Sequence, residues 1–219
     1  MNKKLIILDI LCYGVIPYFV WKFGREPFGD YIAILLSTIP GFIYTVYRFM
    51  KEKQFNIAGL FIIGSLLIST TVNLLSSSAE SMLWNQVYLG FGFAVFHLLT
   101  VLFRKPMALY FTVDMAYLQG YPRKGSKELF HKKGLFMWFQ LMSLLFVIRG
   151  IFQNCLKAWL IGTYGANGYD QVIIYMNISG WVFSGVIVVG YLFISNKIMV
   201  FTGQKKEKKP ETSIDNIQP

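Results

Sequence analysis

The residues best placed to do chemistry are Arg149, Gln153 and Lys157, which follow one another at intervals of four. Side chains four residues apart lie one turn above another on the same face of an α-helix. The three therefore form a polar stripe, with Asn154 beside it. Two cations on one stripe predict that it holds an anionic or strongly polar group.

The setting of this stripe is apolar. It lies within the run 134–163, which is long enough to cross a bilayer core, since roughly 20 residues suffice. An arginine near the centre of such a span costs about 2.5–3.5 kcal/mol on insertion scales. That cost is tolerated only where the charge faces water, a partner or another helix. The sequence therefore predicts a polytopic membrane protein with polar groups inside the bundle.

Other polar side chains are expected at a similar depth. Asn73 and Asn177 both lie in the outer half of an apolar segment, as does most of the stripe. This convergence predicts an outward-facing polar cavity, while the alternative is a set of hydrogen bonds that fixes helix packing. His97 lies well inside the segment 82–103, either as a proton relay or as a neutral side chain bonded to a carbonyl. The acids that could pair with Arg149 all lie near segment ends: Asp9, Asp30, Glu80 and Asp170.

Six apolar segments are expected to position these residues. The chain is 55% hydrophobic and only 15% charged, whereas soluble domains carry about 25% charged residues. We therefore predict an all-α fold, a polytopic membrane helix bundle of six transmembrane helices in residues 1–200, followed by a disordered basic tail, 201–219. Pro17 and Pro40 are expected to kink their helices where a neighbouring helix satisfies the freed carbonyl. The six segments are 5–23, 31–49, 57–76, 82–103, 135–161 and 171–196.

The distribution of basic residues predicts the orientation. Most of the 21 Lys and Arg fall in the segments that share a side with the N-terminus, so both termini are expected in the cytoplasm. This bias accounts for the net charge of +10 without a nucleic-acid partner. In the cytoplasmic loop 104–134, Pro106 is expected to open a short interfacial helix. The basic residues of this loop predict binding of anionic lipids at the cytoplasmic face. They are Arg104, Lys105, Arg123, Lys124, Lys127, Lys132 and Lys133.

The sequence lacks the motifs of the common enzyme classes. HExxH, GxSxG, a Walker loop and GxGxxG are all missing, and two histidines with two cysteines cannot build most metal sites. Cys12 and Cys155 lie in apolar runs, which favours free thiols over a disulfide. We therefore predict that the protein is not an enzyme, with no catalytic residue, metal or cofactor.

Three short stretches carry a family resemblance: LDILCYGVIPYFVWKF, GDYIAILLSTIPGFIYTVYRF and RKPMALYF. Their matching features are Pro17-Tyr18, the pair Ala33 and Pro40, and Arg104-Lys105-Pro106. Over residues 5–111 the chain resembles the intracellular septation protein A type of bacterial membrane protein. The resemblance implies a multi-pass protein of the bacterial inner membrane, without enzymatic activity, near division or envelope maintenance.

Two functional hypotheses follow. The first is a septation-type envelope component that acts by interaction, with a membrane-protein partner or as a homo-oligomer in the lipid bilayer. The second is a small transporter or substrate-binding subunit for an anionic or polar solute, whose site is the pocket around Arg149. Vitamin uptake subunits of similar size supply a fold-level analogy for the second hypothesis.

Overall fold

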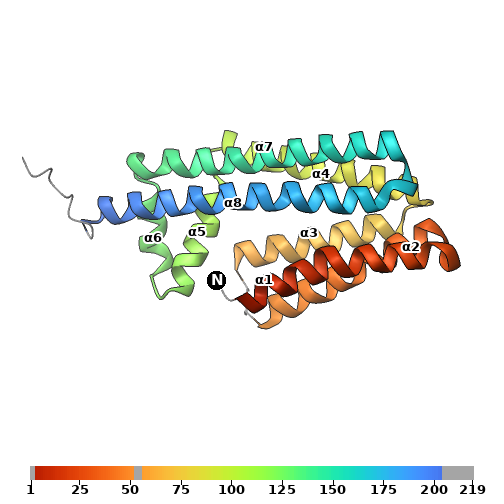
Figure 1. Cartoon of the computed structure of the whole chain (residues 1–219). Coiled ribbons are helices and arrows are strands. Elements are labelled where there is room, and N and C mark those ends of the chain that lie inside the picture. Colours follow the sequence, from red (N-terminus) through yellow and green to blue (C-terminus); the bar gives the residue numbers. More distant parts are fainter. Residues whose placement is uncertain (1–2, 52–55, 204–219) are drawn as a thin grey trace, which may run out of the picture.

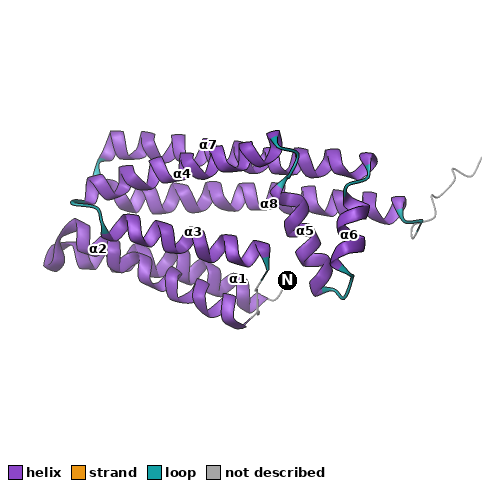
Figure 2. Cartoon of the chain, turned by 180° about the vertical axis from the view of Figure 1, so that it is seen from behind, coloured by secondary structure: helices purple, strands orange, loops and turns teal. Residues whose placement is uncertain are grey.

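The computed structural model of the chain describes residues 3–51 and 56–203, and every regular element among them is a helix (Figures 1 and 2). The all-α prediction is confirmed for this part of the chain. Residues 204–219, most of the predicted tail, lie outside the described residues. The elements are α1 (Lys3–Ile10), the π-helix η1 (Leu11–Val15), α2 (Ile16–Lys51), α3 (Ile57–Leu74), α4 (Ala79–Leu102), α5 (Met107–Leu118), α6 (Arg123–Phe130), α7 (Lys133–Tyr164), the 3-10 helix η2 (Ala166–Gly168) and α8 (Tyr169–Phe201).

The first apolar stretch reverses direction inside α2. Gly29 has φ 77° and ψ 164°, a conformation open to glycine and not to residues with a Cβ. Contacts between the two legs of this hairpin run antiparallel: the Tyr13 hydroxyl lies 2.7 Å from Thr45 Oγ1. Figure 1 shows the two legs side by side, joined at one end of the molecule. The residues before and after Gly29 thus form two helical legs.

Pro17 shows how a helix break is repaired. Pro17 has no N–H to donate to the carbonyl of Tyr13, four residues earlier. Asn177 of α8 donates its side-chain amide to that carbonyl at 3.2 Å. The π-helix η1 ends at Val15, two residues before this proline. The prediction that a neighbouring helix satisfies the freed carbonyl is confirmed at this proline.

Five helices are long and apolar enough to cross a membrane by length and composition. They are Ile7–Lys51, Ile57–Leu74, Ala79–Leu102, Lys133–Tyr164 and Ala166–Phe201. The first of them contains both legs of the hairpin at Gly29. Large apolar side chains remain exposed on the outside of these helices, as contact with acyl chains requires. The fold is therefore compatible with a multi-pass membrane helix bundle.

Two buried clusters hold the bundle together at its two ends. One joins α2, α4, α7 and α8 through side chains such as Trp21, Leu83 and Leu160. The other joins α5, α6, α7 and α8 around Leu109 and Phe139. Figures 1 and 2 show α5 and α6 across one end of the long helices. Between these two clusters lies the site.

Candidate functional site

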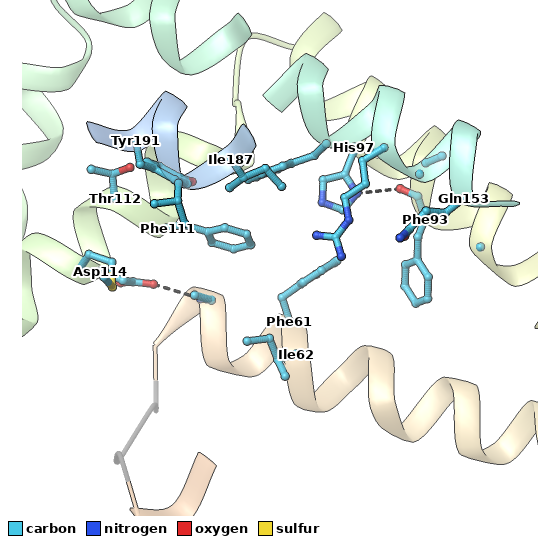
Figure 3. A pocket seen from close by; sticks show the side chains of 18 of the residues that line it. Phe61, Ile62, Phe93, His97, Phe111, Thr112, Asp114, Gln153, Ile187 and Tyr191 are labelled. Atoms are coloured by element: carbon cyan, nitrogen blue, oxygen red, sulfur yellow. Dashed lines mark hydrogen bonds between the residues drawn. The ribbon is translucent and has the colours of Figure 1, made fainter. Parts of the chain in front are cut away.

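A cavity of about 1060 Å³ lies among α3, α4, α5, α7 and α8. This volume is slightly above the range of roughly 300–1,000 Å³ for small-molecule sites. Its wall is largely apolar and includes the rings of Phe61, Phe111 and Phe146. In Figure 3, Asp114 lies at one end of this space, while Gln153 lies at the other.

Arg149 lines this cavity from near the middle of α7 and is partly buried. Its guanidinium makes no hydrogen bond or ion pair with any residue in 3–51 or 56–203. Two of the acids considered as partners are committed elsewhere: Asp9 pairs with Arg48 at 3.4 Å, and Asp30 pairs with Arg25 at 3.2 Å. Arg149 is thus a cation on a mostly apolar wall, without a counter-charge from the described protein.

Gln153 and Asn154 differ in how far they are available to a ligand. Gln153 lines the cavity one turn from Arg149, and its amide has no hydrogen-bond partner within the described chain. Asn154 also lines the cavity, but its amide donates to the carbonyl of Gly150 in the same helix at 2.7 Å. The Asn154 side chain also packs directly against Gly90 of α4. Arg149 and Gln153 are therefore the uncommitted polar groups of the stripe.

Lys157, in contrast, is part of a hydrogen-bonded network. Its Nζ donates to Gln86 Oε1 of α4, and Gln86 Nε2 donates to Asn73 Oδ1 of α3 at 2.8 Å. The hydroxyl of Tyr31 in α2 donates to the backbone carbonyl of Asn73 at 3.1 Å. Asn73 does not line the main cavity; with Lys157 and Gln86 it lines a second one of about 340 Å³. Gln86 was not among the residues predicted from the sequence. A glutamine inside an apolar segment does, however, indicate a polar partner on a neighbouring helix.

His97 lines the cavity from α4 and is held between aromatic rings. Its Nδ1 lies 2.8 Å from the carbonyl oxygen of Phe93, which can only accept, so Nδ1 carries the hydrogen. The ring packs edge-on against Phe61 at 5.4 Å and Phe146 at 5.9 Å between centroids. A hydrogen bond to a backbone carbonyl and contacts with aromatic rings are thus the interactions that the structure shows for this side chain.

The structure places two further residues differently from the sequence analysis. Asn177 does not line the cavity, because its amide bonds to Tyr13 and to its own helix. Asp114 of α5 does line it, with a carboxylate that accepts the N–H of Ala58 at 3.1 Å and pairs with Arg123 at 3.6 Å. The sequence analysis missed Asp114 because it treated residues 104–134 as a loop outside the bundle.

The seven predicted lipid-binding residues lie on the α4–α5 link, on α6 and at the start of α7, and all seven are exposed. Some lie over aromatic rings: the Arg123 guanidinium is 4.2 Å from the centroid of Tyr117, and Lys127 Nζ is 5.6 Å from that of Tyr110. The other five are Arg104, Lys105, Lys124, Lys132 and Lys133. Exposed basic side chains close to the ends of long apolar helices suit contact with anionic head groups.

Metal-ligating side chains do not cluster in the described part of the chain, where no group of three or more His, Cys, Asp or Glu comes together. Cys12 and Cys155 are free thiols. No family model, curated protein or solved structure matches the chain.

Proposed function

We propose that the chain is a six-span protein of the bacterial inner membrane that binds a polar or anionic ligand in its central cavity. The six spans are the two legs of the hairpin at Gly29, then α3, α4, α7 and α8. An even number of spans puts both termini on one side. The exposed basic residues of the α4–α5 link, of α6 and of the start of α7 favour the cytoplasm for that side, in contact with anionic lipids.

The unpartnered guanidinium of Arg149 carries this proposal. Burying a charge without a partner is costly, and the described residues offer Arg149 no counter-charge. Anionic oxygens of a ligand would supply the missing partner, with Gln153 as a second donor one turn away. A structural role alone fits Lys157, which is bonded to Gln86, better than it fits Arg149.

A binding role of this kind belongs to a small transporter or to the substrate-binding subunit of a transport system. The cavity among five helices favours this hypothesis, because ligand sites of helical bundles lie between facing helices. An envelope component of the septation type, acting through a partner protein or as a homo-oligomer, remains a prediction from the motifs of residues 5–111. Co-purification with division or cell-wall machinery would favour that role.

The proposal is tested by measuring which small molecules stay bound to the protein during purification. Wild type, Arg149→Leu, Arg149→Lys and the control Lys197→Leu are purified in mild detergent, and bound small molecules are quantified by mass spectrometry per folded molecule. Lys197 is an exposed cation outside the cavity. We expect Arg149→Leu to fold, because leucine suits an apolar span, and to lose the ligand that wild type and Lys197→Leu retain.

Arg149→Lys should retain part of the ligand, since lysine keeps the charge but lacks the planar donor fork. Equal retention by wild type and Arg149→Leu would refute the binding role of Arg149.

A further inference from the structure

The cavity opens to one side of the bundle, between α3, α5 and α8. Several side chains line the cavity and are at the same time exposed on the molecular surface. Ile62 of α3 is 43% exposed, and Val188 and Leu192 of α8 are 54% and 60% exposed. On α5, Met115 and Leu118 are 59% and 58% exposed. The rim of this opening is therefore built from large apolar side chains, which suit acyl chains and not water.

The depth of the rim supports the same conclusion. Ile62 lies in the half of α3 that begins near α5, and Val188 and Leu192 lie in the half of α8 that ends near α6. In a chain with its basic end at the cytoplasm, these positions fall within the inner leaflet. A molecule that enters here comes from the membrane.

The interior of the cavity suits an apolar chain better than a small hydrated ion. Most of its wall is apolar, so burying an acyl chain against it is favourable. Figure 3 shows Phe61, Phe111 and Ile187 between its two ends. An apolar chain would cover this wall, whereas a small hydrated anion would leave most of it uncovered.

We propose that the ligand is an anionic amphiphile taken from the inner leaflet, an inference that rests on the proposed function and narrows its ligand. The head group, a phosphate or carboxylate, lies at Arg149 and Gln153. The apolar chain runs along the aromatic wall and leaves between α3 and α8. Asp114, at the opposite end, offers no donor to an anionic head, so the charge of the ligand belongs at the Arg149 end.

Three matched probes test this inference: oleyl phosphate, oleyl alcohol and inorganic phosphate. The protein is reconstituted in phosphatidylcholine nanodiscs, and binding of radiolabelled oleyl phosphate is measured with empty nanodiscs subtracted. We expect saturable binding of one oleyl phosphate per chain. Oleyl alcohol should compete about tenfold to hundredfold more weakly, because it lacks the charge-assisted bonds. Inorganic phosphate, without a chain, should not compete at the same concentration.

Arg149→Leu should lower the affinity for oleyl phosphate by at least about tenfold and remove its preference over oleyl alcohol. Lys197→Leu, which loses a cation outside the cavity, should bind as wild type does. Because the three probes are compared on the wild type, the inference stays testable if Arg149→Leu fails to fold.

The two ways to fail are distinguishable. If inorganic phosphate displaces oleyl phosphate as well as the unlabelled amphiphile does, and its binding depends on Arg149, the ligand is an aqueous anion. That result overturns the amphiphile and leaves the proposed function standing. If neither anion binds in a manner that depends on Arg149, both are overturned.

Discussion

Replacing Gly90 by alanine should disrupt the close packing of α4 on α7 and lower the stability of the protein, whereas replacing Gly92 by alanine should not. A Cβ on Gly90 would lie 2.5 Å from Cγ of Asn154, while a Cβ on Gly92 would meet nothing within 4 Å. Both substitutions gain helix propensity, about 1 kcal/mol each in a helix interior. The propensity gain is common to both, so their difference in stability isolates the contact with Asn154.

The size of this difference follows from what Asn154 must give up. To avoid the new methyl group, its side chain has to rotate and lose the 2.7 Å hydrogen bond to the carbonyl of Gly150. Such a bond contributes about 0.5–1.5 kcal/mol, and overpacking a tight contact costs about 1–3 kcal/mol. Gly90→Ala should therefore be about 1.5–4.5 kcal/mol less stable than Gly92→Ala.

The assay is reversible unfolding in mixed micelles, with rising dodecyl sulfate and helix content followed by circular dichroism. A double-mutant cycle adds Asn154→Ala to each glycine variant. Because the clash needs the asparagine side chain, Asn154→Ala should recover stability in the Gly90→Ala background and not in the Gly92→Ala background. Equal stability of Gly90→Ala and Gly92→Ala would refute the close packing of α4 on α7.

Three further predictions concern topology, lipid contact and helix repair. In an otherwise cysteine-free chain, a membrane-impermeant reagent added outside should label Ser77→Cys and Thr163→Cys but not Lys127→Cys; labelling of the last from outside would overturn the orientation. Asn177→Leu leaves the carbonyl freed by Pro17 without its side-chain donor and should cost about 1–3 kcal/mol of stability in the same micelle assay. Adding Pro17→Ala should recover part of that loss, and no recovery would contradict the repair. Binding of anionic lipid to the protein in phosphatidylcholine nanodiscs should weaken by up to about 1 kcal/mol for each charge removed, and unchanged binding would count against the cytoplasmic lipid surface. The residues to neutralise together are Arg123, Lys124, Lys127, Lys132 and Lys133.

The helices could be predicted from the sequence because long charge-poor runs have few other solutions in a membrane. Their ends could not. α7 covers Lys133–Tyr164 and α8 covers Tyr169–Phe201, whereas the apolar windows gave 135–161 and 171–196. A hydropathy window shows how many residues the apolar part of a bilayer can cover. The helix itself continues beyond that window until a residue such as Gly165, with φ 62°, ends its hydrogen bonding. The length of an apolar run therefore does not predict where its helix begins and ends.

The close contact of α4 with α7 was readable in principle. Gly90 and Ala94 are small residues four apart, the spacing that lets two membrane helices approach. Across the contact, a Cβ on Gly150 would lie 3.1 Å from the Cβ of Ala94. Which helix would meet this pair depends on the rotation of both helices in the bundle. That rotation is set by packing and is not encoded in local spacing.

The stripe on α7 was predicted as one unit, and the structure divides it by depth. At its C-terminal end, Lys157 joins Gln86 and Asn73, a satisfied network of the kind that fixes helix packing. Toward the middle of the helix, Arg149 and Gln153 face a cavity without partners among the described residues. The sequence spacing is identical at both ends, so spacing could not separate them. What separates them is whether a facing helix supplies an acceptor, and α4 supplies one only at the level of Gln86. The two interpretations of the stripe, packing and ligand binding, therefore need not exclude each other, since each suits a different end of the same helix face.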